Sequence, residues 1–217
     1  MQRADDVAVE RAVRAFASAM IGLAAHELNN RLAVMRETIG LMDDLARAGK
    51  AGAAGTARAH SSLDDQIGRA LNIVRTFSGL GGALGATGGD FDAGAAIGDL
   101  LSLAERWARQ HSLQLEREVA DGLPRASGDP ALFLCLAYRL LCAAGEGRAA
   151  SGGLLVRASR DGDAIRVSLL SRGERAATAP APGTLDDEIN RGLARRLGGE
   201  LLFEGGGAPT ILLAAAR

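Results

Sequence analysis

The strongest chemical signal in the sequence is the stretch GLAAHELNNRL at residues 22–32. His26 is followed directly by the carboxylate of Glu27, and the amides of Asn29 and Asn30 lie within one helical turn. An imidazole that is unprotonated near neutral pH can act as a nucleophile, and a neighbouring carboxylate can accept the proton on its other ring nitrogen. These groups are suited to receiving a phosphoryl group.

Metal chemistry is the competing interpretation, and the residue types argue against it. The motif HExxH binds zinc through two histidines four residues apart, and Asn30 stands where the second would be. Cys135 and Cys142 lie seven residues apart in one apolar helical pattern, which indicates core residues rather than a redox or metal pair. No metal site is therefore expected in this chain.

Two successive helices are predicted to position this stretch. Apolar residues recur every three or four positions over residues 17–42 and again over 63–77. The stripes consist of Ala17, Ile21, Ala24, Leu28, Leu32, Met35, Ile39 and Met42 in the first helix, and of Leu63, Ile67, Ala70, Val74 and Phe77 in the second. Glycine-rich stretches at 49–55 and 79–89 are expected to end these helices. Such a hairpin is stabilised mainly by pairing with a second copy, so we expect a homodimeric four-helix bundle.

His26 falls opposite the apolar stripe of the first helix. It lies two residues from both Ala24 and Leu28, which turns it toward solvent. Gly22 and Asn30 share its face, one turn on either side. A solvent-facing histidine is usually a plain surface residue, but glycine and asparagine weaken a helix interior, and such departures from good helix chemistry favour a functional site.

Residues 89–217 show a mixed pattern of helices and strands, typical of an α+β fold. Helices are predicted at residues 91–110, 128–147 and 184–197, and strands at 112–119, 153–160, 164–171, 199–204 and 210–216. Asp129 is the expected cap of its helix, with Pro130 in the first turn.

The other notable residues receive structural interpretations. His60 is expected at a cap just before the second helix, and His111 at the end of a later helix, where a cation suits the helix dipole. Trp107 is expected to pack between its helix and the sheet.

Composition excludes several classes of partner. The chain has 25 basic and 26 acidic side chains and a net charge of -1, so a nucleic-acid partner is not expected. Its N-terminus is charged, and no apolar run reaches the length that crosses a bilayer. We expect a cytoplasmic protein with no membrane partner.

The segment AAHELNNRL, on the first helix of a predicted hairpin, resembles the phospho-acceptor box of two-component sensor histidine kinases, whose usual form is close to HELNNPL. The resemblance implies that His26 is the phosphorylated residue, Glu27 its adjacent acid, and Asn30 the amide used in phosphatase chemistry. Arg31 replaces the usual proline, so the family's helix bend is in doubt. The order of elements in residues 89–217 is similar to that family's ATP-binding α/β sandwich, so the resemblance covers nearly the whole chain.

The nucleotide chemistry of that family is missing. Arg139 and Ala143 stand at the places of asparagines that help to hold magnesium and phosphates. Ser171 stands where the family has the aspartate that recognises adenine. The glycine-rich lid is reduced to APAPGTLDDE at residues 179–188, which hardly provides a phosphate-cradling backbone. We therefore expect that the chain binds no cofactor.

The expected architecture is a helical hairpin for dimerisation and phospho-acceptance at residues 1–80, followed by a degenerate ATPase-like α/β sandwich at 89–217. The leading interpretation is a histidine phosphotransferase of a phosphorelay. His26 would carry a phosphoryl group between receiver-domain aspartates, with Mg²⁺ on the receiver. The partners would be response-regulator receiver domains and an upstream hybrid or sensor kinase.

Two alternatives remain open. One is a degenerate histidine kinase that acts as a phosphatase or weak kinase on a response regulator, with Asn30 orienting the attacking water. The other is a non-enzymatic dimeric regulator. A pure scaffold would not need His26, Glu27 and Asn30 together, and a self-sufficient kinase would need the missing nucleotide site.

Overall fold

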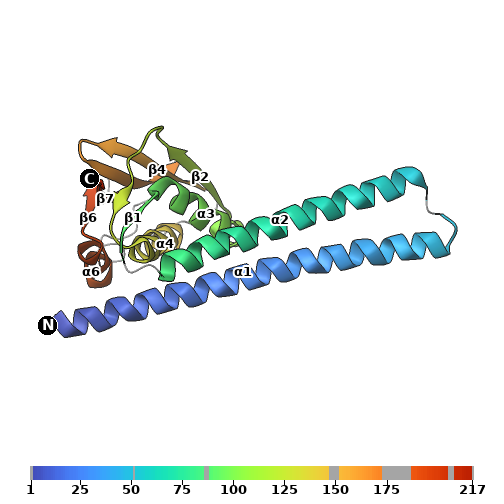
Figure 1. Ribbon diagram of the computed structural model, residues 1–217, viewed down its shortest axis with the longest axis horizontal. Helices are drawn as coiled ribbons and strands as arrows, with labels where there is room; N and C mark the ends of the chain where they lie inside the picture. Colours follow the sequence, from blue (N-terminus) through green and yellow to red (C-terminus); the bar gives the residue numbers. More distant parts are fainter. Residues whose placement is uncertain are drawn as a thin grey trace.

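The computed structural model describes residues 2–50, 52–85, 88–146, 152–172, 187–204 and 208–216. A long helical hairpin is followed by an α/β unit that sits against one end of it (Figure 1). The chain is therefore α+β, as the sequence predicts, with a helical hairpin preceding an α/β sandwich.

The hairpin consists of α1 (Gln2–Arg47) and α2 (Ala53–Gly85). Both glycine-rich stretches interrupt the helices less than predicted: α2 already includes Gly55, and it continues to Gly85. An interior glycine costs a helix about 1 kcal/mol, and tertiary packing offsets this near the end of α2, where Leu80 is buried. His60 consequently lies inside α2, so its predicted place at a cap before that helix is wrong.

The α/β unit contains a five-stranded sheet and three helices. The helices are α3 (Ala93–Gln110), α4 (Pro130–Glu146) and α6 (Glu188–Arg196), and the strands are β2 (Leu113–Val119), β4 (Gly152–Asp161), β5 (Ala164–Arg172), β6 (Glu200–Glu204) and β7 (Ala208–Ala214). The sheet order is β2-β4-β5-β7-β6, with β2 and β4 parallel and the other pairs antiparallel. The predicted order of elements is confirmed, although residues 184–186 of the last predicted helix and 179–186 of the lid lie outside the described residues.

A short strand pair was not predicted. It joins β1 (Asp90–Phe91) to β3 (Ala126–Ser127). The next residue, Gly128, has a φ of +132°, and a Cβ there would lie 2.6 Å from the carbonyl oxygen of Leu197. Only glycine suits this close approach to the end of α6.

Aspartates fix the starts of the three helices of the α/β unit. The carboxylate of Asp92 accepts a hydrogen bond from the Ala95 amide at 2.9 Å. Asp187 accepts one from Asn190 at the start of α6. The predicted cap Asp129 accepts one from the Ala131 amide at 2.8 Å, with Pro130 as the first helical residue. Each bond satisfies an amide that the first turn of a helix leaves unpaired.

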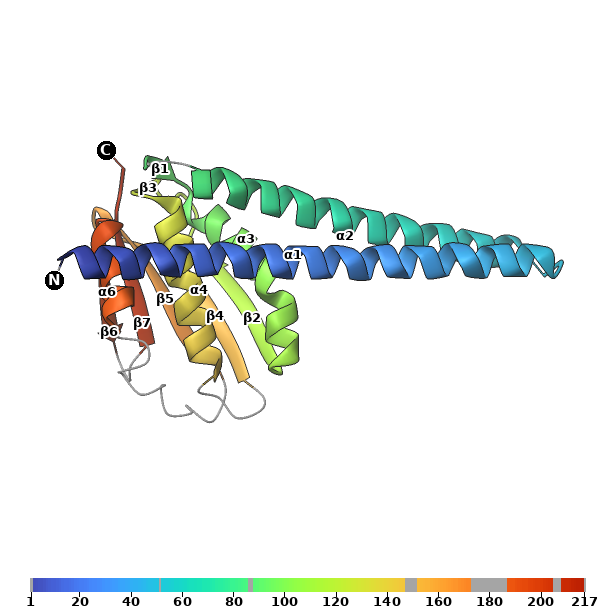
Figure 2. The ribbon, with the colours of Figure 1, turned by 90° about the horizontal axis from the view of Figure 1, so that it is seen from below.

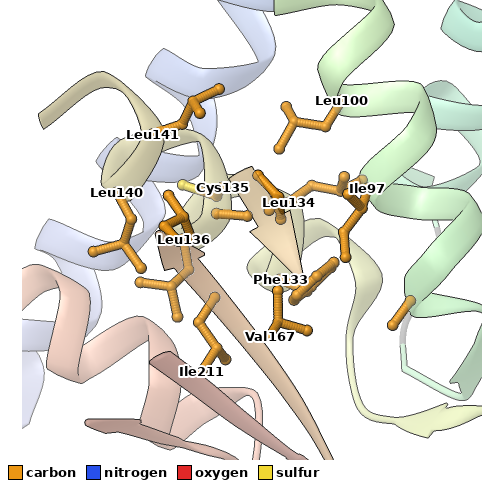
Figure 3. Close-up of a cluster of buried hydrophobic side chains, with 14 of the residues drawn as sticks. Ile97, Leu100, Phe133, Leu134, Cys135, Leu136, Leu140, Leu141, Val167 and Ile211 are labelled. Carbon is orange, nitrogen blue, oxygen red and sulfur yellow. The ribbon is translucent and has the colours of Figure 1, made fainter. Parts of the chain in front are cut away.

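The core lies between the sheet and α3 and α4 (Figure 3). Phe133 and Leu136 of α4 are fully buried, together with Val167 of β5 and Ile211 of β7. Cys135 belongs to this cluster, and its burial raises the pKa of its thiol to about 12, so the thiol stays protonated at neutral pH. This supports the interpretation of Cys135 as a core residue.

The N-terminal half of α1 packs on the helices of the α/β unit. It crosses α6 and α4 (Figure 2). Val9, Phe16 and Met20 are buried there, and the ring of Phe16 lies 5.6 Å from that of Tyr138 on α4. The predicted stripe of α1 does not include Val9, Phe16 or Met20, because the residues that cover them lie far along the chain, in the α/β unit.

Three residues of the predicted α1 stripe are exposed in the single chain. Ile21, Leu32 and Ile39 are 55%, 57% and 50% exposed. On α2 the corresponding residues are Ile67 and Val74, which are 45% and 47% exposed. The hairpin thus has an apolar face that its own two helices do not cover.

No helix among the described residues is both long enough and apolar enough to span a bilayer.

Candidate functional site

His26 lies near the middle of α1, with its side chain exposed, as the helical spacing predicts. In the part of the chain that the structure describes, its ring makes no hydrogen bond or ion pair. Gly22, one turn earlier on the same face, is exposed, and a Cβ added there would meet nothing within 4 Å. Among the described residues, the face of α1 that carries His26 is therefore open at Gly22, which leaves room for a partner beside the imidazole.

The two amides of the motif differ in exposure. Asn29 is exposed, whereas Asn30 is half-buried. At about 100° per residue, Asn30 lies one turn beyond His26 and roughly on the same face. It is therefore the better placed of the two to contact a group bound at His26.

The carboxylate of Glu27 faces two arginines. Arg31 Nη2 donates to Glu27 Oε1 from one turn later in α1. Arg106 Nη1, on α3, lies 3.9 Å from Glu27 Oε2. The side chain of Glu27 is only 17% exposed, so the two guanidinium groups compensate a carboxylate that is largely removed from water. The structure thus shows Glu27 paired with arginines rather than with the ring of His26.

Arg31 stands where the phospho-acceptor box that this segment resembles has a proline. It lies within an uninterrupted α1, so the helix has no break at this point. Its Nη1 donates to Gln66 Oε1 of α2 at 3.2 Å, which ties the two hairpin helices together beside Glu27. Its Nε is buried and has no hydrogen-bond partner in the described part of the chain.

A cleft of about 460 Å³ opens beside this ion pair, between the hairpin and α3. Its charged lining residues are Glu27, Arg31, Asp65, Arg69, Glu105, Arg106 and Arg109. Two of the acids are paired with arginines of their own helices, Asp65 with Arg69 and Glu105 with Arg109. Among the described residues, Arg106 pairs with no acid of its own helix, and its guanidinium reaches across to Glu27.

The contacts of Arg31 and Arg106 with Glu27 were not predicted from the sequence. For Arg31 a signal existed, because an acid and an arginine four residues apart on a helix are neighbours. For Arg106 there was none, because its contact with Glu27 depends on how α3 packs against α1.

Of the three positions where the sequence lacks the expected nucleotide ligands, Arg139 makes contacts of a different kind. Arg139 Nε donates to Asn190 Oδ1 at 2.7 Å, and its Nη2 donates to Asp187 Oδ2 at 2.6 Å. The guanidinium thereby links α4 to the start of α6. Ala143 is half-buried on α4, and Ser171 is exposed near the end of β5. Within the described ranges, no three His, Cys, Asp or Glu side chains gather closely enough to hold a metal ion.

Searches of protein-family models and of curated proteins gave no match. Among solved structures, the chain is similar to the histidine kinase AdeS of Acinetobacter baumannii, with 14% identity, coverage of 88% of this chain and 98% of that chain, and a TM-score of 0.46. It is also similar to histidine kinase ThkA in complex with the response regulator protein TrrA, with 16% identity, coverage of 98% and 66%, and a TM-score of 0.49. A bacterial phosphotransferase gives 15% identity, coverage of 91% and 95%, and a TM-score of 0.46.

Proposed function

We propose that this protein is a histidine phosphotransferase that passes a phosphoryl group between receiver-domain aspartates through His26, without binding ATP. The observation that carries the proposal is the exposed imidazole of His26, which has no partner among the described residues and stands in a phospho-acceptor-like sequence.

The transfer is a displacement at phosphorus. The unprotonated ring nitrogen of His26 attacks the phosphorus of an aspartyl phosphate, and an N–P bond forms as the acyl P–O bond breaks. The receiver's carboxylate leaves with the electron pair. The same step in reverse, on a second receiver, returns the imidazole to its free state. The receivers supply Mg²⁺, and this chain supplies position and an accessible nucleophile.

The arrangement around Arg139 supports transfer without nucleotide. A guanidinium held by Asn190 and Asp187 occupies the place where the resembling family has a polar ligand of magnesium. A guanidinium paired in this way offers no oxygen or nitrogen ligand to a divalent cation. The phosphoryl group would therefore come from a receiver rather than from ATP.

A response-regulator receiver is the partner that this chemistry requires. One of the similar structures is a histidine kinase in complex with a response regulator protein, which supports the same kind of partner here. The exposed small residues Gly22 and Ala25 next to His26 leave room for a docking surface.

We further propose that the chain works as a homodimer. Ile21, Leu32 and Ile39 form one exposed apolar face of α1, and His26 lies well away from that face around the helix axis. Pairing of two hairpins through this face would cover it and leave His26 open.

Asn30 favours a second candidate function, in which the chain dephosphorylates a response regulator. Its half-buried amide shares the face of His26 and would orient a water molecule toward a docked aspartyl phosphate.

The test is to incubate the purified chain with radiolabelled Mg-ATP and, separately, with a phosphorylated receiver domain, and to follow acid-labile label on the chain. We expect label from the receiver and none from ATP. The variant His26→Gln should keep its helical circular dichroism and lose the label. Label from ATP alone would contradict the proposal, and loss of phosphate from the receiver without label on His26 would favour the phosphatase.

A further inference from the structure

We propose that Arg106 is a positioning residue through which the α/β unit controls the charge next to His26. The inference deepens the proposed function and rests on it. It gives the α/β unit a task that needs no nucleotide, namely to hold a guanidinium against the carboxylate that follows the phospho-acceptor in the sequence.

The contact joins two parts of the chain that are distant in sequence. Arg106 lies on α3, in the α/β unit, and Glu27 lies on α1, in the hairpin. Their side chains are 28% and 17% exposed, and the closest nitrogen and oxygen atoms are 3.9 Å apart. Because Arg31 pairs with the other oxygen of the same carboxylate, two guanidinium groups from two helices share one acid.

The packing of the neighbouring residue on α3 sets the direction of Arg106. The next residue, Trp107, packs against Gly145 of α4 so closely that a Cβ on Gly145 would lie 2.4 Å from the indole ring. The indole also contacts the ring of His111, at a centroid distance of 4.7 Å and an angle of 34° between the ring planes. Since successive helical residues differ by about 100° in direction, fixing Trp107 against α4 directs Arg106 toward the hairpin.

The local charge balance gives Arg106 its expected effect. Glu27 contributes one negative charge beside His26, and Arg31 and Arg106 contribute two positive charges. The surplus positive charge attracts the incoming phosphoryl group. Without Arg106 the charges of Glu27 and Arg31 cancel, and Arg31 alone compensates the carboxylate.

The position of Arg106 also makes this charge depend on how the two units pack. The ion pair borders the open cleft of about 460 Å³ between the hairpin and α3, so its separation changes when α3 moves relative to α1. Docking of the α/β unit would therefore tune the reactivity of His26, although Arg106 does not touch the imidazole.

The experiment uses phosphoramidate, a small phosphoryl donor that needs no receiver. His26 attacks its phosphorus, the P–N bond of the donor breaks, and ammonia leaves. Phosphohistidine is followed by ³¹P NMR over a series of donor concentrations in the full chain, and His26→Gln gives the background from the other two histidines. The variants are Arg106→Gln, Arg106→Lys and, as a matched control one turn away on the same helix, Arg109→Gln, with circular dichroism confirming that each is folded.

We expect Arg106→Gln to slow phosphorylation of His26 by about three- to tenfold, because the site loses a positive charge that attracts the phosphoryl group. Arg106→Lys should restore most of the rate, and Arg109→Gln should react like the wild type. A wild-type rate in Arg106→Gln would overturn the inference, as would a lysine variant as slow as the glutamine variant. The phosphoramidate experiment contains no receiver, so its result does not depend on transfer between receivers. A failure of that transfer would count against the proposed function but not against the role of Arg106.

Discussion

At the scale of single residues, the structure gives Arg31 contacts that the sequence did not predict. In the sequence it is the residue that breaks the resemblance, because the related motif has proline there. In the structure it pairs with Glu27 and donates to Gln66, so it stabilises α1 and links it to α2 beside the candidate site. A proline at this position would offer no guanidinium to Glu27.

Asp99 on α3 gives a prediction about pH. Burial raises the pKa of Asp99 above its ordinary value of 3.8, and the nearby guanidinium of Arg117 offsets part of that effect. The ionised carboxylate therefore costs stability at neutral pH, and this cost disappears as the pH falls through the raised pKa toward 3.8. We expect Asp99→Asn to increase the free energy of unfolding at pH 7, with a gain that shrinks as the pH is lowered.

Urea unfolding of wild type and Asp99→Asn across this pH range is the measurement, with Asp121→Asn, at an exposed turn, as the control. A gain that is the same at every pH would show that ionisation of Asp99 is not its source.

The sequence predicted the exposed place of His26 from spacing alone, because a helix fixes the direction of each side chain relative to its neighbours. It could not predict that Glu27 turns toward arginines. One of those arginines, Arg106, is 79 positions further along the chain, and helical periodicity carries no information on contacts between separately folded elements.

At the scale of elements, the helices and strands of the α/β unit follow their sequence patterns closely, since alternation and caps such as Asp129 are local signals. The hairpin departs further. Helix α2 continues through glycines that were expected to end it, because contacts with α1 and α3 compensate for low intrinsic helix propensity. The pair of β1 and β3 escaped prediction because strands of two residues have no periodicity.

The contact between α3 and α4 gives a prediction about packing. Gly145 has no room for a methyl group beside Trp107, so Gly145→Ala forces the indole to move. We expect a loss of about 1–3 kcal/mol in the free energy of unfolding, typical of overpacking in a core. The matched control is Gly22→Ala on exposed α1, where a Cβ meets nothing and alanine should add about 0.5–1 kcal/mol. Urea unfolding decides, and equal effects of the two substitutions would contradict this account of α3 packing.

At the scale of the whole molecule, the exposed apolar face of the hairpin is the feature that a single chain leaves unexplained. Leu32 and Leu41 are both exposed leucines of α1, at 57% and 60%. They are nine residues apart, which places them on opposite sides of the helix, about half a turn from each other. Only Leu32 belongs to the face shared with Ile21 and Ile39.

These two leucines distinguish the proposed dimer face from general surface hydrophobicity. Leu32→Asp should convert a dimer into a monomer, since it would bury an unpaired carboxylate in the interface. Leu41→Asp should leave the dimer intact. Light scattering coupled to size-exclusion chromatography measures the mass of each variant. A monomeric wild type, or dissociation by both substitutions alike, would refute pairing through this face.

Because α1 is continuous, the number of residues between its docked segment and His26 sets the direction in which His26 points. One unbroken helix from Gln2 to Arg47 carries both the residues that dock on the α/β unit and His26. Helical phase links them: one residue inserted between Met20 and His26 would turn the imidazole by about 100° relative to the docked segment. Seven inserted residues would return it to within about 20° of its direction. The phase of the helix therefore constrains the number of residues between Met20 and His26, even where the individual residues are free to vary.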